Sequence, residues 1–138
     1  MRHKTRVRPS DIIPHLYEGE LVKYYDSSRC NDYYITSYGR FIAVWYKDWK
    51  FLTRTPTSHQ VIRYHHQVRM PQGAVSVHRE VGKHFLPDYK EELFVCHTDE
   101  DADDKFIQSV YNLWMGTHSD NMRDAYSKGR KVPSNQFM

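Results

Sequence analysis

Cysteine is scarce in this sequence: Cys30 and Cys96 are the only two among 138 residues. Two cysteines so far apart give neither the close spacing of a zinc site nor a disulfide framework. No apolar run is long enough to cross a bilayer. The basic start of the chain runs into Pro9 and polar residues, which is not the pattern of a signal peptide. These absences argue against a membrane protein and a disulfide-stabilised domain, and they make the cytoplasm the default expectation.

Apolar residues are also few, at 39% of the chain, but aromatic residues are frequent, at 14%. The eleven tyrosines and three tryptophans can each bury a ring and leave a polar atom in contact with water. The composition therefore indicates a folded chain with a modest core. Its length suits one compact domain, or one domain with a small module attached.

Basic residues gather at both ends of the chain, and a short acidic run lies between them. Arg2, Lys4, Arg6 and Arg8 stand at the start without an acid among them, and Arg123, Lys128, Arg130 and Lys131 stand near the end. The acidic run is Asp99 to Asp104. This distribution suits binding of a polyanion together with a cation, but from charge alone two solvated tails are the favoured interpretation.

The first half of the chain predicts an antiparallel β module after an unstructured start. Residues 1–32 are expected to form a basic arm and an irregular segment. Residues 33–73 are expected to form the module, because short runs rich in aromatic and β-branched residues alternate with turns. The predicted strands are Tyr33–Thr36, Phe41–Tyr46 and Trp49–Leu52, with a further strand in 61–64 and 67–69.

The second half changes period. Val77, Val81 and Phe85 are spaced four apart, which predicts a helix over residues 77–85 with Ser76 as its cap. A strand at 93–95 leads to His97, and a second strand covers 113–115. Thr117 is expected to cap a helix that runs from His118 to about Lys128, with Gly129 ending it. Residues 132–138 are expected to be a flexible tail.

Three polar side chains lie at the ends of the two predicted strands and in the final helix. His97 follows a strand, Asn112 begins the next one, and Asn121 lies in the first turn of the final helix. An imidazole held by a carbonyl is a good general base for water near neutral pH. A carboxamide oxygen is a ligand suited to Mg²⁺. One metal ion and one base are enough to hydrolyse a phosphodiester.

The order of these pieces resembles the HNH endonucleases of the phage and intron homing type. The resemblance covers roughly residues 74–130, and it is carried by Val75–Val81, Phe94–His97, Asn112–Thr117 and Asp120–Ala125. It implies an α+β fold in which the N-terminal antiparallel β module precedes a ββα-metal (HNH, or His-Me finger) motif over residues 74–131. If the chain is encoded by a phage, the expected location is the cytoplasm of the host cell.

The resemblance also implies a role for each matching residue. His97 matches the general base, Asn112 the residue that orients the base and stabilises the loop, and Asn121 a metal ligand. Cys96 stands where the homing branch usually has a second, aspartate ligand. The implied cofactor is a divalent metal ion, with Mg²⁺ or Mn²⁺ favoured and Zn²⁺ or Ni²⁺ as alternatives, because a thiol prefers softer metals. The implied partner is DNA, and its phosphates are expected to meet Arg79, Arg123, Lys128, Arg130 and Lys131.

The predicted function is therefore metal-dependent hydrolysis of DNA. Nicking by a monomer is the simplest expectation, although the sequence does not fix the oligomeric state. A second hypothesis, motivated by Cys96 and the acidic loop, is a degenerate nuclease scaffold that binds DNA or a protein partner without cleavage. A third is a general nucleic-acid-binding β module with basic tails.

Overall fold

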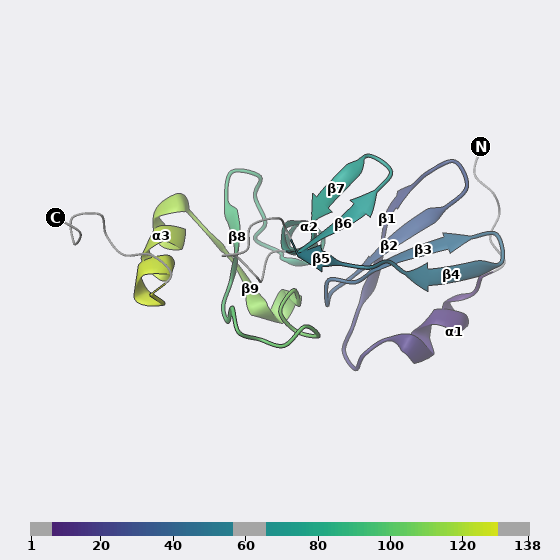
Figure 1. Ribbon diagram of the computed structural model, residues 1–138, viewed down its shortest axis with the longest axis horizontal. Coiled ribbons are helices and arrows are strands. Elements are labelled where there is room, and N and C mark those ends of the chain that lie inside the picture. Colours follow the sequence, from purple (N-terminus) through teal and green to yellow (C-terminus); the bar gives the residue numbers. More distant parts are fainter. Residues whose placement is uncertain (1–6, 57–65, 130–138) are drawn as a thin grey trace.

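The computed structural model describes residues 7–56 and 66–129, which form a mixed domain of antiparallel sheets and α-helices. Figure 1 shows the elements following one another along the long axis. Helix α3 lies at one end, and the β8–β9 hairpin lies next to it. Helix α2 and the β5–β7 sheet occupy the middle, and the four-stranded sheet with α1 lies at the other end.

The four-stranded sheet has the order β1-β2-β3-β4, with each strand antiparallel to its neighbour. Its strands are β1 (Val22–Ser27), β2 (Asp32–Thr36), β3 (Phe41–Trp45) and β4 (Asp48–Phe51). The last three confirm the predicted meander within one residue. The prediction of an irregular segment before residue 33 was wrong for β1, which is mostly exposed and polar. Its strand conformation depends on pairing with β2 rather than on an alternating pattern of its own.

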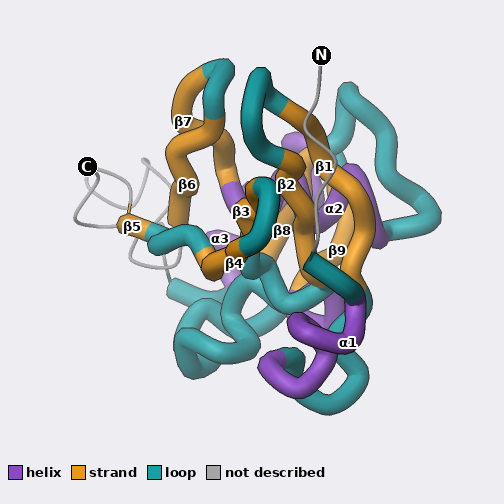
Figure 2. Tube along the Cα trace, turned by 90° about the vertical axis from the view of Figure 1, so that its right-hand side faces the viewer, coloured by secondary structure: helices purple, strands orange, loops and turns teal. Residues whose placement is uncertain are grey.

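A second sheet consists of β5 (Thr55–Pro56), β6 (His66–Met70) and β7 (Gly73–Ser76), again antiparallel. Strand β6 confirms the strand predicted at 67–69, whereas the strand predicted at 61–64 lies outside the described residues. Figure 2 shows the β6–β7 hairpin standing beside the strands of the first sheet. Val68 and Met70 of β6 are buried in the same cluster as Tyr33 and Ile35 of β2.

The C-terminal elements are α2 (Val77–Phe85), β8 (Phe94–His97), η2 (Val110–Asn112), β9 (Leu113–Gly116) and α3 (His118–Ser127). Helix α2 has the predicted bounds, but Ser76 makes no side-chain cap. Its hydroxyl instead lies 3.1 Å from Nδ1 of His78. Thr117 does cap α3: its hydroxyl accepts from the Asp120 amide at 3.1 Å, and Asp120 accepts from the Thr117 amide at 3.0 Å. Gly129 follows the helix with φ of 77°, the left-handed conformation expected at its end.

Within the described residues, one hydrophobic core joins the two halves of the chain. It contains strand residues of both N-terminal sheets, Val77 and Val81 of α2, Val95 of β8 and Leu113 of β9. Val77 and Val81 are fully buried, which confirms the face predicted from their spacing. The β module and the segment from residue 74 onward are therefore packed together, and burial of their shared apolar surface holds one against the other.

The chain before β1 is fastened to the first sheet by a buried ion pair. Helix α1 (Pro9–Ile12) and η1 (Ile13–His15) come first, and Glu20 follows. The Glu20 side chain is fully buried, and its carboxylate accepts hydrogen bonds from Arg40 Nε at 2.9 Å and from the Thr36 hydroxyl at 2.5 Å. Burial alone raises the pKa of Glu20, but these donors outweigh it and hold the pKa below its usual value. Among the described helices, none is long and apolar enough to span a membrane.

Candidate functional site

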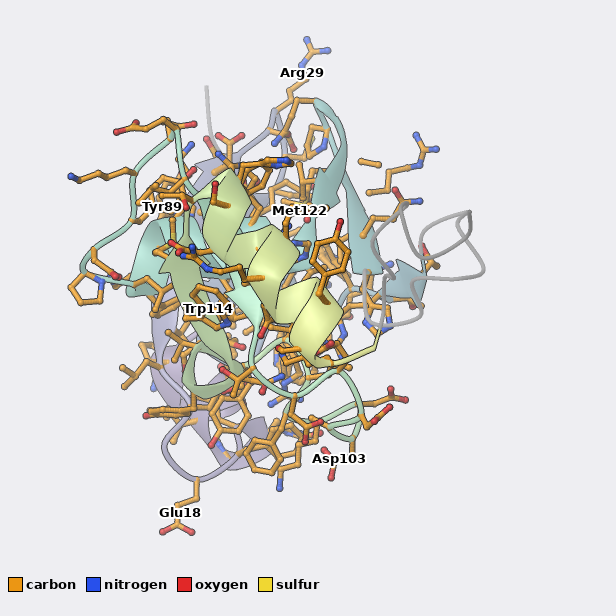
Figure 3. The ribbon with its side chains drawn as sticks, turned by 90° about the vertical axis from the view of Figure 1, so that its left-hand side faces the viewer. Glu18, Arg29, Tyr89, Asp103, Trp114 and Met122 are labelled. Carbon is orange, nitrogen blue, oxygen red and sulfur yellow. The ribbon has the colours of Figure 1, made fainter. Side chains whose placement is uncertain are left out.

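The residues predicted to carry chemistry lie on the β8–β9 hairpin and on α3. In the hairpin, Cys96 pairs with Trp114 and His97 pairs with Leu113. Helix α3 contacts both strands. Figure 3 looks onto α3 with the hairpin behind it, and the labelled Trp114 and Met122 lie on either side of the helix. The strand, strand and helix predicted from the sequence are therefore brought together.

Cys96 and Asn121 meet between β8 and α3. The Cys96 side chain is buried, and its Sγ lies 3.6 Å from Oδ1 of Asn121. Asn121 is not needed as a helix cap, because Thr117 and Asp120 fill that role. Its carboxamide oxygen is instead directed at the thiol. The structure thus brings together the two residues that the sequence predicted as metal ligands.

His97 is buried, with 3% of its surface exposed, and its ring is held on two sides. Its Nε2 lies 2.9 Å from Oε1 of Gln108, whose side chain is fully buried. The ring of His78, on the first turn of α2, lies 4.8 Å from the His97 ring between centroids, at an angle of 47°. The imidazole therefore has a fixed orientation, which a proton acceptor in a reaction requires.

Cys96 and His97 are neighbours on one strand, so their side chains leave β8 on opposite faces. The contacts agree with this rule, since Cys96 meets α3 while His97 meets α2 and the loop that precedes η2. The candidate ligand pair and the candidate base are consequently adjacent along the chain but are supported by different elements.

Asn112 stabilises the acidic loop between β8 and β9. Its Oδ1 accepts from the Asp99 amide at 3.0 Å, and its Nδ2 donates to the Asp99 carbonyl at 2.9 Å and to the Ile107 carbonyl at 3.0 Å. Its backbone carbonyl accepts from the Thr98 amide at 2.8 Å. These bonds extend the hairpin beyond His97. Asn112 thus stabilises the loop that begins at the candidate base.

Lys128 holds the other side of this loop. Its ammonium group donates to the His97 carbonyl at 3.0 Å, the Thr98 carbonyl at 2.7 Å and the Glu100 carboxylate at 2.8 Å. It also lies 3.0 Å from Oδ2 of Asp124. Burial alone lowers the pKa of Lys128, but the two carboxylates outweigh it and hold the pKa above its usual value.

The other residues predicted to meet DNA are placed differently. Arg79 donates to the carbonyls of Leu93 and Glu91, at 3.2 and 2.9 Å, and therefore holds the chain between α2 and β8. Arg123 is largely exposed, with a side-chain exposure of 74%, and pairs with Asp120 one turn earlier. Arg130 and Lys131 lie outside the described residues. Among the described cations of this set, Arg123 is the most accessible to a phosphate group.

The donor atoms of the ligand pair fit a metal ion that accepts both sulfur and oxygen. Within the described residues, no group of three or more His, Cys, Asp or Glu side chains forms a ready-made metal site. The Cys96 thiol and the Asn121 carboxamide oxygen nevertheless converge from two elements. A thiolate and a carboxamide suit a borderline ion such as Zn²⁺ better than Mg²⁺. Two protein ligands leave positions for water and phosphate oxygens.

Gln108 was not predicted from the sequence. It lies between an acidic run and a short helical turn, and no periodic pattern or motif distinguishes it there. One signal was available: a polar residue that follows the apolar Phe106 and Ile107, in a loop whose other residues are mainly charged. Such a residue is a candidate for a buried polar group, which must find a hydrogen-bond partner.

Comparison with known proteins finds a solved structure with a similar fold. No protein-family model matches the sequence, and no curated protein matches it. The fold is similar to a structure described as "DNA binding and cleavage by the HNH homing endonuclease I-HmuI", with a TM-score of 0.58 and 25% sequence identity. The match covers 75% of this chain and 57% of that chain, so this chain spans little more than half of its length. The likeness supports an HNH-type fold, and it extends well beyond residues 74–131.

Proposed function

We propose that this protein is a divalent-metal-dependent DNA endonuclease that nicks one strand. The observation that carries the proposal is the contact of Cys96 with Asn121, which joins strand β8 to helix α3. His97 follows Cys96 on the same strand, and its imidazole has a fixed orientation. The similar solved structure is of an enzyme described as binding and cleaving DNA. A ββα-metal arrangement of these residues accounts for both observations.

In the proposed reaction, His97 removes a proton from a water molecule as the water oxygen attacks the phosphorus atom. The bond from phosphorus to the 3′-oxygen breaks, and the 3′-oxygen takes a proton from solvent. The products are a 5′-phosphate and a 3′-hydroxyl. Lys128 and Asn112 fix the backbone that carries His97, so the imidazole keeps its position during the reaction.

Cys96 and Asn121 are the residues that would hold the metal ion. When bound, a divalent ion supplies Lewis-acid stabilisation of the negative charge that develops on the phosphate and the leaving oxygen. The ligand pair favours Zn²⁺ or Ni²⁺ over Mg²⁺, because Cys96 supplies a sulfur atom.

We assign phosphate contact to the exposed Arg123 and to Arg130 and Lys131, which follow α3 in the sequence. The head groups of Arg79 and Lys128 are already engaged with loop carbonyls and carboxylates, so we assign them to holding the site rather than to DNA. Contacts with phosphate are independent of base sequence and weaken as salt concentration rises.

The proposal is tested by incubating supercoiled plasmid with the protein and Mg²⁺, Mn²⁺, Ni²⁺ or Zn²⁺ in turn. The expected result is conversion to the open circular form, with the rate reduced at least about 100-fold in His97→Ala, because general-base catalysis contributes at least about that factor. Asn121→Ala should raise the metal concentration needed for half-maximal rate and leave the unfolding midpoint close to that of the parent. Failure to nick in every metal, or equal nicking by His97→Ala, contradicts the proposal.

A second function is favoured by one specific observation, the near-complete burial of His97 together with a thiol at the position of the usual carboxylate ligand. In this alternative the protein binds DNA on an inactive nuclease scaffold. The same plasmid distinguishes the two, since a gel shift without any nicking in the four metals is the result that the alternative predicts.

A further inference from the structure

Gln108 is a fully buried polar side chain that contacts the candidate base. None of its surface is exposed, and its Oε1 lies 2.9 Å from Nε2 of His97. Burying a carboxamide is costly unless its polar atoms are bonded. An apolar side chain of similar length would fill the same space without the cost of burying polar atoms. This placement requires an explanation beyond packing.

We propose that Gln108 is the positioning residue that sets the tautomer of His97, with the proton on Nε2 and the basic lone pair on Nδ1. The proposal rests on the proposed role of His97 as the base. A carboxamide oxygen only accepts hydrogen bonds, so the ring nitrogen that faces it must carry hydrogen. A neutral imidazole has one such nitrogen, and its other nitrogen is then the acceptor.

The same contact persists when the ring takes a proton in the proposed reaction. When Nδ1 takes a proton, Nε2–H stays bonded to Oε1, and a hydrogen bond from a charged donor is stronger than one from a neutral donor. Gln108 therefore stabilises the imidazolium that proton removal from water produces. The neighbouring His78 ring, 4.8 Å away, packs against His97 and limits its rotation, but it does not supply this acceptor.

Gln108 is itself held by the N-terminal sheet. The turn between β2 and β3 brings Gly39 so close that a Cβ there would lie 2.6 Å from Cβ of Gln108, and Gly39 has φ of 79°. On either side of Gln108, the Val110 amide donates to the Ser37 carbonyl at 2.8 Å and the Ile107 carbonyl accepts from Asn112 at 3.0 Å. The β module thus reaches the imidazole through Gln108.

The tautomer can be read without any cleavage reaction. Long-range ¹H–¹⁵N correlation spectra of protein labelled at histidine distinguish Nε2–H from Nδ1–H at alkaline pH, where the ring is neutral. The His97 signal is identified by its loss in His97→Ala. The expected spectrum of the parent protein shows Nε2–H alone. An Nδ1–H ring in the parent overturns the proposal before any Gln108 variant is made.

Two variants then test the acceptor. Gln108→Met keeps the length of the side chain and removes the oxygen, so the His97 ring should populate both tautomers. The kcat for nicking should fall by about 10- to 100-fold, the range typical of residues that orient a functional group from behind. The KM should change little. Gln108→Glu restores an acceptor and should restore the single tautomer and part of the rate. Gln72→Met, which removes a carboxamide from the exposed β6–β7 turn, is the matched control and should change neither quantity.

The outcomes separate this proposal from the proposed function. A folded Gln108→Met protein with an unchanged tautomer and an unchanged kcat overturns the positioning role. Loss of the single tautomer in that variant, with no nicking by any protein, supports the positioning of His97 and contradicts only the nuclease proposal. If Gln108→Met does not fold, the parent spectrum and Gln108→Glu still decide the question.

Discussion

Replacing Lys128 by methionine removes the cation that holds the loop after His97. The ammonium group lies within hydrogen-bond distance of the His97 carbonyl, the Thr98 carbonyl and the Glu100 carboxylate, at 2.7 to 3.0 Å, and beside Asp124. An ammonium group has three hydrogens, so its donors are fully used. Methionine keeps most of the stem of the side chain and removes the charge.

The expected loss follows from these contacts. Hydrogen bonds to charged groups contribute about 1.5–3 kcal/mol each when buried. The Lys128 side chain is 27% exposed, so solvent screening reduces each contribution well below that range. Three such bonds then give a total of about 2 kcal/mol. For a chain of this length, that loss corresponds to a fall in Tm of about 6 °C. The assay is urea or thermal unfolding followed by circular dichroism.

Arg123→Met is the control, because Arg123 lies on the same helix and makes an exposed pair with Asp120. Its loss should lower the free energy of unfolding far less than the loss of Lys128 does, because solvent screens this exposed pair. DNA binding should rank the two variants the other way, with the larger effect in Arg123→Met. The salt dependence of binding should weaken by about one unit of slope in Arg123→Met and stay unchanged in Lys128→Met. Equal stability losses in the two variants, or a slope change confined to Lys128→Met, would refute the assignment of Lys128 to the loop.

Two further predictions concern residues outside the ligand pair. Asn112→Ala removes three hydrogen bonds to Asp99 and Ile107 and should lower the free energy of unfolding by about 2–3 kcal/mol. Hydrogen exchange at the Asp99 amide should become faster. Unchanged exchange there would show that the loop does not depend on Asn112. Glu20→Gln should cost about 2–3 kcal/mol at neutral pH, because it breaks a buried pair with Arg40. The folded pKa of Glu20 is lowered, so its contribution is present above the unfolded value and is lost as pH falls through the folded value. Unfolding measured between neutral pH and pH of about 3 should therefore show a smaller acid-induced loss in Glu20→Gln than in the parent, and equal losses would contradict this account.

Local signals in the sequence were sufficient for the elements that carry their own pattern. The four-residue spacing of Val77 and Val81 gave the bounds of α2, and Thr117 with Gly129 marked both ends of α3. Strand β1 could not be predicted in this way, because its burial pattern lacks an apolar face and its conformation comes from pairing with β2. Ser76 failed as a cap because its hydroxyl lies against His78 instead.

The candidate site also contains one part that could be predicted from the sequence and one part that could not. The resemblance implied that Asn121 is a metal ligand and that Cys96 stands at the position of another, and the structure brings these two residues together although they lie 25 positions apart in the sequence. Gln108 could not be predicted, because its contact with His97 depends on how the loop folds back and on the Gly39 turn of a different sheet. Interactions set by tertiary packing leave no local periodicity in the sequence.

The proposed metal pair is tested most directly by replacing Cys96 with aspartate, the ligand that the homing branch usually has there. The measurement is the rate of plasmid nicking in Mg²⁺ divided by the rate in Zn²⁺, for the parent and for Cys96→Asp. Because a carboxylate suits Mg²⁺ and a thiolate does not, this ratio should rise by about tenfold or more in the variant, a change of about 1.4 kcal/mol in relative barrier. An unchanged ratio in two active proteins would show that Cys96 does not bind the metal ion. The absence of nicking by both proteins would contradict the proposal that this protein is a nuclease.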